Sequence, residues 1–140
     1  MESKESYIEQ ILKDILGVGG ELLKTQDQDK LRNFVTITIN GDVPANHLAI
    51  NTNLSNGKEG VVIYILTNKR LIKIDIGDKI QSSSFILDSI INIERELLDD
   101  DRIQIKILFP NDSFGLRYPA TDTQASKFFQ SLDQSRVKGD

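Results

Sequence analysis

The fold is decided by one short stretch of the chain, which runs Tyr64-Ile65-Leu66-Thr67-Asn68-Lys69-Arg70-Leu71-Ile72-Lys73-Ile74. Two apolar segments flank a polar turn, which is typical of a β-hairpin. Asn68 and Lys69 tolerate the positive φ angles of a tight two-residue turn, Asn68 especially. The Thr67 hydroxyl and the Arg70 guanidinium can bond across the hairpin or to nearby carbonyl groups. We therefore interpret these polar residues as structural rather than ligand-binding.

The strand pattern continues on both sides of this hairpin. Residues 60–67 are so apolar that we expect both faces of their strand to be buried. Ile72, Ile74 and Ile76 instead alternate with polar residues and predict a strand with one wet face. Further strands are predicted at Phe34–Ile39, His47–Asn51, Gln81–Leu87, Ile91–Leu97, Ile103–Phe109 and Phe114–Tyr118. The sequence thus predicts a β-sheet region of about seven strands over residues 32–118.

A helix is expected near each end of the chain. The first covers residues 1–17, with a Ser6–Glu9 capping box and an apolar face of Tyr7, Ile8, Ile11, Leu12, Ile15 and Leu16. The second covers residues 121–135, with a Thr121–Gln124 capping box and a core-facing stripe of Ala125, Phe128, Phe129 and Leu132. Because no linker or repeat interrupts the pattern, we expect residues 1–140 to form a single domain.

The order of these elements, together with three segments, resembles the pleckstrin-homology (PH) superfold and above all its bacterial PH and GRAM branches. The segments are the hairpin at Tyr64–Ile74, the strand and corner at Phe85–Ile93, and the ending at Phe114–Tyr118 before the helix with Phe128 and Phe129. The resemblance covers roughly residues 60–135. It implies a mainly β (α+β) fold: a PH-like bent antiparallel sheet or partly open barrel of about seven strands with a C-terminal capping helix. The N-terminal helix is extra to that fold.

Composition disfavours several classes of function. The chain has 140 residues, no cysteine, one histidine (His47) and a net charge of −4. It can therefore form neither disulfides nor thiolate metal sites, and one histidine cannot build the usual His-based metal centre. We interpret His47 as a surface or hydrogen-bonded residue. We expect no cofactor and no enzymatic activity, because the sequence does not assemble a nucleophile, a base and an oxyanion stabiliser.

Charge and hydropathy bear on partners and location. The negative net charge argues against nucleic acid as a partner. Residues 1–5 are polar and acidic and lack the features of a secretory signal, and no apolar segment approaches the ~18 residues that span a bilayer. We therefore expect a soluble, cytoplasmic protein.

Charged residues gather in two regions. The acidic residues Glu94, Glu96, Asp99, Asp100 and Asp101 are interpreted as a solvated hairpin tip, with docking of a basic partner as the alternative. Basic residues concentrate between positions 58 and 79, at Lys58, Lys69, Arg70, Lys73 and Lys79. In the resembled family, the loop that grips phosphoinositides is rich in Lys and Arg. We place the corresponding connection at Asn40–Asn46, whose single acid and lack of base disfavour inositol phosphates.

The favoured function is a non-catalytic interaction module that binds a protein or peptide, including copies of itself. A sheet edge can accept an added strand, and the groove between a sheet edge and a helix can hold a peptide. The N-terminal helix is the first interface to test, through Tyr7, Ile8 and Leu12. The alternative is a peripheral membrane or lipid-binding domain, which requires a basic patch of Lys58, Lys69, Arg70 and Lys73.

Overall fold

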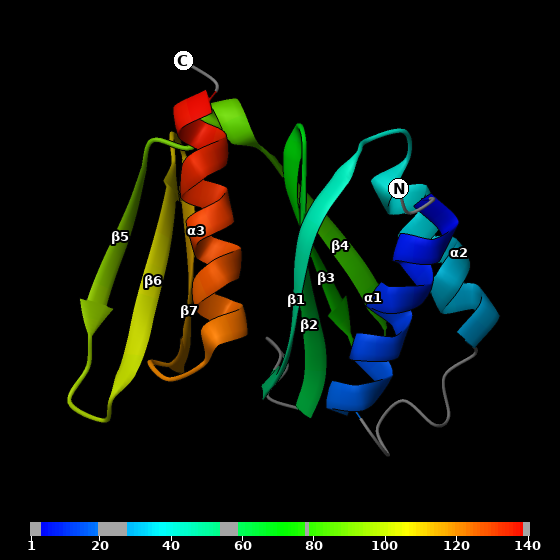
Figure 1. Ribbon diagram of the computed structural model, residues 1–140, viewed down its shortest axis with the longest axis horizontal. Helices are drawn as coiled ribbons and strands as arrows, with labels where there is room; N and C mark the ends of the chain where they lie inside the picture. The colour runs from blue at the N-terminus through cyan, green and yellow to red at the C-terminus, as the bar shows by residue number, and fades with distance from the viewer. Residues whose placement is uncertain (1–3, 20–27, 54–58, 78, 139–140) are drawn as a thin grey trace. The chain divides into compact units, whose positions relative to one another are not determined.

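The computed structural model describes residues 4–19, 28–53, 59–77 and 79–138 (Figure 1). In chain order the elements are α1 (Lys4–Gly19), α2 (Gln28–Ile39), β1 (Pro44–Asn53), β2 (Glu59–Thr67), β3 (Arg70–Ile76), β4 (Ile80–Ile86), the 3₁₀ turn η2 (Leu87–Ser89), β5 (Asn92–Leu97), β6 (Arg102–Phe109), β7 (Asp112–Pro119) and α3 (Thr123–Lys138). The strands form two antiparallel sheets that do not close into a barrel, which confirms the predicted mainly β fold with a C-terminal helix. The chain divides into two compact units, residues 1–84 and 85–140.

The first unit is a sheet in the order β1-β2-β3-β4, with α1 and α2 on one of its faces (Figure 1). Ile63 lies opposite Ile74 and Ile65 lies opposite Ile72. Since side chains alternate between the faces of a strand, these residues point to the same side and meet the helices. The buried core consists of Ile8, Ile11, Leu12, Ile15, Leu31, Val35, Ile39, Val61, Ile63, Ile65, Ile72, Ile74 and Ile76.

The burial of β2 and β3 follows the sequence pattern. Every residue from 60 to 67 is buried, as predicted for a strand covered on both faces. In β3, Ile72, Ile74 and Ile76 are buried, whereas Lys73 and Asp75 between them are only partly buried. The predicted alternation in β3 is therefore confirmed.

The predicted strand at Phe34–Ile39 is wrong, because these residues form the second half of helix α2. The β-region therefore begins at Pro44 rather than at residue 32. Val35 and Ile39 stand four residues apart and are both buried, which is the spacing of one helix face. Their β-branched neighbours favour strands, and Ile37 is left 72% exposed. Burial of the helical stripe against the sheet outweighs that local preference.

The helix ends also differ from the sequence prediction. Helix α1 runs on to Gly19 and already includes Ser6, so the Ser6–Glu9 capping box and the stop at residue 17 are wrong. Helix α3 begins at Thr123, and its cap is Asp122, whose carboxylate accepts the backbone N–H of Ala125 (3.0 Å). Asp122 rather than Thr121 therefore satisfies the helix N-terminus.

The second unit is the sheet β5-β6-β7 with helix α3. Ile105 lies opposite Arg95 on one side and Leu116 on the other, so these side chains share a face of the sheet. This face meets α3, where Tyr118 stacks on Phe129 with ring centroids 5.5 Å apart. The predicted apolar stripe of α3 is confirmed, since Ala125, Phe128, Phe129 and Leu132 are all buried.

Candidate interaction site

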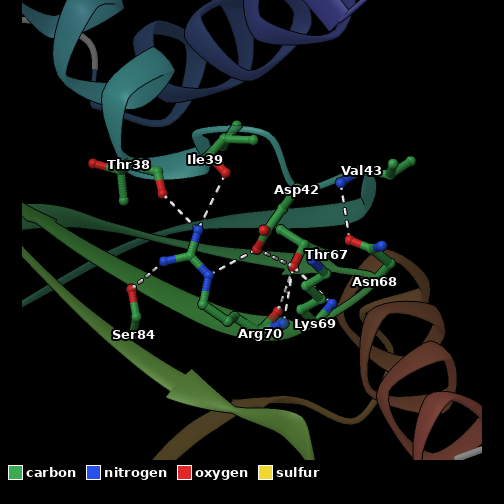
Figure 2. Close-up of polar contacts among 9 residues, drawn as sticks. All are labelled: Thr38, Ile39, Asp42, Val43, Thr67, Asn68, Lys69, Arg70 and Ser84. Carbon is green, nitrogen blue, oxygen red and sulfur yellow. Dashed lines mark hydrogen bonds and ion pairs between the residues drawn. The ribbon is translucent and has the colours of Figure 1, made fainter.

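The turn between β2 and β3 is organised by the hydroxyl of Thr67 (Figure 2). This oxygen accepts the backbone N–H groups of Lys69 (3.1 Å) and Arg70 (2.9 Å). It donates to the carboxylate of Asp42 (2.9 Å), and Thr67 itself is buried. The expectation that Asn68 and Lys69 adopt positive φ angles is wrong. Among the described non-glycine residues, only Asn40 and Asp101 have a positive φ. The hydroxyl closes the turn instead.

Arg70 ties this turn to three other parts of the unit (Figure 2). Its Nε donates to Asp42 (2.7 Å), and its Nη1 donates to the hydroxyl of Ser84 on β4 (3.2 Å). Its Nη2 donates to the carbonyl oxygens of Thr38 (2.9 Å) and Ile39 (3.1 Å) at the end of α2. The last carbonyls of a helix lack partners within the helix and attract cations. Arg70 therefore caps α2 and holds it beside β4.

Asp42 reaches this position because α2 ends in a left-handed turn. Asn40 and Gly41 have φ angles of 30° and 82°, and the second of these favours glycine. Burial raises the pKa of Asp42, but hydrogen bonds from Arg70 and Thr67 and the charges of Arg70 and Lys69 outweigh it. The pKa of Asp42 therefore lies below its ordinary value of 3.8.

Two hydrogen bonds between Asn68 and Val43 complete the network. The amide oxygen of Asn68 accepts the N–H of Val43 (2.9 Å), and the N–H of Asn68 donates to the carbonyl of Val43 (3.0 Å). The predicted bonds of Thr67 and Arg70 across the hairpin and to nearby carbonyls are thus confirmed. Through these bonds, residues Thr67–Arg70 of the hairpin turn connect α2, the start of β1 and β4.

His47 is hydrogen-bonded, as the sequence predicted. Its Nε2 lies 2.5 Å from Asp14 Oδ2, and its Nδ1 lies 3.1 Å from the Tyr7 hydroxyl. Both partners come from α1, so His47 links that helix to β1. Among the described residues, no group of three or more His, Cys, Asp or Glu side chains is arranged to hold a metal ion.

The N-terminal helix does not offer the predicted interface. Ile8 and Leu12 are buried in the core of the first unit, and Tyr7 packs against that core. Their apolar face is covered by the chain's own sheet, so the proposal that a partner docks on it is wrong. No described helix is long and apolar enough to cross a membrane.

The acidic residues are divided between a strand and a turn. Glu94 and Glu96 are exposed on β5 and, with Arg95, Gln104 and Lys106, line an open depression. Asp100 lies in the following turn, where a hydrogen bond from Arg102 lowers its pKa below the ordinary value. The predicted solvent exposure of Glu94, Glu96, Asp99, Asp100 and Asp101 is confirmed.

The basic residues are not all free to meet a ligand. Arg70 forms an ion pair with Asp42 and hydrogen bonds with the end of α2. Lys73 lies 3.7 Å from the carboxylate of Asp75. Lys69 and Lys79 are exposed, and Lys58 lies outside the described residues. Residues 40–43 lead from α2 into β1, so the Asn40–Asn46 segment is not the β1–β2 connection. That connection is residues 54–58, which the structure does not describe.

The free edge of β4 is the feature that sequence reasoning missed. β4 is the last strand of its sheet, and Gln81, Ser82, Ser83 and Ser84 on it are all exposed. In the described part of the chain, no strand pairs with the side of β4 that faces away from β3. A run of neutral polar residues between Ile80 and Phe85 was the available signal.

The fold has solved relatives. A crystal structure of a DUF1696 family protein with a pleckstrin-homology domain from Shewanella loihica PV-4 superposes with a TM-score of 0.53. It is 20% identical, and the match covers 77% of this chain and 95% of that one. This chain has a PH-like fold. A pleckstrin-homology domain from Shewanella amazonensis SB2B matches with a TM-score of 0.52 and 15% identity, over 79% of this chain and 99% of that one.

Comparison by sequence gives no match. No protein-family model and no curated protein matches the chain. At 15–20% identity the PH-like structures establish the architecture alone. The assignment to the GRAM branch stays a prediction.

Proposed function

We propose that this chain is a non-catalytic PH-like module that binds an extended segment of protein by adding it as a strand to β4. The exposed edge of β4 carries this proposal. An edge strand presents backbone N–H and C=O groups without partners, and an added strand satisfies them. In this chain the exposed residues Gln81–Ser84 supply such an edge.

The side chains of β4 favour strand addition. Natural sheets protect their edges with charged residues, prolines or bulges. β4 has none of these, since it reads Ile-Gln-Ser-Ser-Ser-Phe-Ile. The other edges are protected. β5 carries Glu94, Arg95 and Glu96, and β1 begins with Pro44 and a register shift. β7 carries Asp112, Arg117 and Pro119. A partner strand therefore meets least resistance at β4.

The lipid-binding alternative has less support. It requires Arg70 to be available, but this guanidinium makes hydrogen bonds to Asp42, Ser84, Thr38 and Ile39. Withdrawing it would remove the charged partner of Asp42 and one hydrogen bond from each of the carbonyls of Thr38 and Ile39. We therefore expect vesicles containing anionic lipid to bind this chain no better than neutral vesicles.

The proposal is tested with peptides selected from a random library on the purified chain. Peptides that bind by strand addition are expected to shift the NMR signals of the backbone amides of residues 81–84. Ser83→Pro should abolish their binding, because proline disturbs the strand and removes a donor. Ser83→Thr keeps a neutral strand-forming residue and should retain it. Peptides whose shifts map to other elements would contradict the proposal.

A further inference from the structure

Helix α2 lies above the edge strand β4. Arg70 donates hydrogen bonds to the Thr38 carbonyl at the end of α2 (2.9 Å) and to the Ser84 hydroxyl on β4 (3.2 Å), so one guanidinium holds the two elements together (Figure 2). On its other side α2 meets α1, because Arg32 pairs with Glu9 of that helix at 2.5 Å. The flank of α2 that faces away from α1 is therefore the one beside the free edge of β4.

This flank of α2 is apolar. Phe34 stands two residues after Arg32, about 200° around the helix at roughly 100° per residue, so it points away from α1. Phe34 packs on the core of the first unit and is partly exposed. Ile37 follows three residues later on the same flank and is 72% exposed. An added strand at β4 would therefore lie beside apolar surface of α2.

β4 directs every second side chain toward α2. Ile80 packs on the helical core, and Ser84 accepts a hydrogen bond from the guanidinium that caps α2. By alternation, Ser82 between them also lies on the helix-facing side, whereas Gln81 and Ser83 lie on the other side and are exposed. The helix-facing side of an added strand would follow the same alternation, because paired strands share their faces.

Phe34 and Ser82 lie at the same height along the sheet. Arg70 joins Thr38 to Ser84, and both α2 and β4 approach this junction from the same end of the sheet. Phe34 precedes Thr38 by four residues, about 6 Å along a helix, and Ser82 precedes Ser84 by two residues, about 6.6 Å along a strand. A helix-facing side chain added beside Ser82 therefore meets the ring of Phe34.

We propose that the segment added to β4 is an amphipathic peptide with apolar side chains at every second position, and that Phe34 selects it. This inference rests on the proposed function and names the class of peptide. The apolar side chains face α2 and pack on Phe34, Ile37 and Ile80. The polar side chains between them lie beside the exposed Gln81 and Ser83.

Substitutions in the peptide test the inference without changing the chain. The starting peptide is one that shifts the amide signals of residues 81–84. Replacing its helix-facing set of alternate residues with serine should weaken binding roughly ten-fold or more in isothermal titration calorimetry, because less apolar surface is buried. Replacing the other set with serine should leave the affinity nearly unchanged. Equal losses for the two sets would overturn the inference.

A second test examines Phe34 in the chain. NMR of the complex should show NOEs between the Phe34 ring protons and the apolar side chains of the peptide. Phe34→Ser should weaken binding, whereas Thr36→Ala, at an exposed position on another side of α2, should bind as the wild type does. The amide spectrum shows whether each variant is folded, and the NOEs do not depend on any variant. A complex without NOEs to Phe34 would contradict its role.

These outcomes separate the inference from the function beneath it. If peptides shift the amides of residues 81–84 but show no preference for apolar residues at alternate positions, strand addition stands and selection by Phe34 is wrong. If no peptide reaches that edge, both proposals fail.

Discussion

Replacing Arg70 by methionine (Arg70→Met) probes the network that holds α2 beside the sheet. The change removes four hydrogen bonds: one to Asp42, one to Ser84 and two to the carbonyls of Thr38 and Ile39. Methionine keeps much of the apolar stem of arginine. The loss therefore reports mainly the polar contacts.

The size of the effect follows from the burial of the partners. A hydrogen bond to a charged group contributes about 1.5–3 kcal/mol, and each bond to a carbonyl contributes roughly 1 kcal/mol. The Asp42 side chain is 10% exposed and Arg70 is 26% exposed, so water replaces some of these contacts. We expect the free energy of unfolding to fall by about 2–4 kcal/mol, below the simple sum.

Urea denaturation followed by circular dichroism measures this change. Arg102→Met is the matched control, because Arg102 pairs with Asp100 at 2.7 Å but both side chains are about half exposed. Exposed pairs often contribute nothing measurable, so we expect no resolved change for the control. A loss in Arg70→Met that is no larger than in Arg102→Met would refute the structural role of the network.

Three further predictions follow from single contacts. Asp42 has a lowered pKa in the folded chain, so its carboxylate stabilises the fold above its ordinary pKa, and that contribution is lost as pH falls through the lowered value. Asp42→Asn should therefore reduce the loss of unfolding free energy at acid pH. An unchanged acid dependence would show that this carboxylate does not contribute to it. Ile11→Ala should cost about 2–5 kcal/mol in urea denaturation because the side chain is fully buried, whereas Lys13→Ala on the exposed side of α1 should cost little. Equal losses would mean that α1 is not packed as described. Asp122→Ala should cost roughly 1 kcal/mol through loss of the α3 cap, and Asp122→Asn should restore most of it.

The hairpin at the centre of the first unit was predictable from sequence. Residues 60–67 are apolar without interruption, and Ile72, Ile74 and Ile76 alternate with polar residues, so the period of each strand is unambiguous. The hydrogen bonding of Thr67 and Arg70 was also predictable from the sequence. Their partner Asp42 was not, because it lies 28 positions before Arg70 and reaches it only after α2 has folded against the sheet.

Helix α2 shows why the rest was harder to predict. Val35, Ile37 and Ile39 fit the two-residue period of a strand. Val35 and Ile39 also stand four positions apart, so they fit one face of a helix equally well. The choice depends on Leu31 and on the sheet that the helix covers, which local sequence does not contain. The same holds for the β4 edge. Whether a strand is the last in its sheet is a property of topology, so a neutral polar run became a candidate site only once the strand order was known.

Amide hydrogen exchange at residues 81–84 tests the central claim most directly. At high dilution, amides of β4 that bond to β3 should exchange slowly, and those on the free edge should exchange rapidly. Adding a selected peptide should protect the second set. Amides that are all protected without the peptide would show that the edge is covered within the chain. Amides that stay unprotected with the peptide would show that nothing binds there, and either result would contradict strand addition at β4.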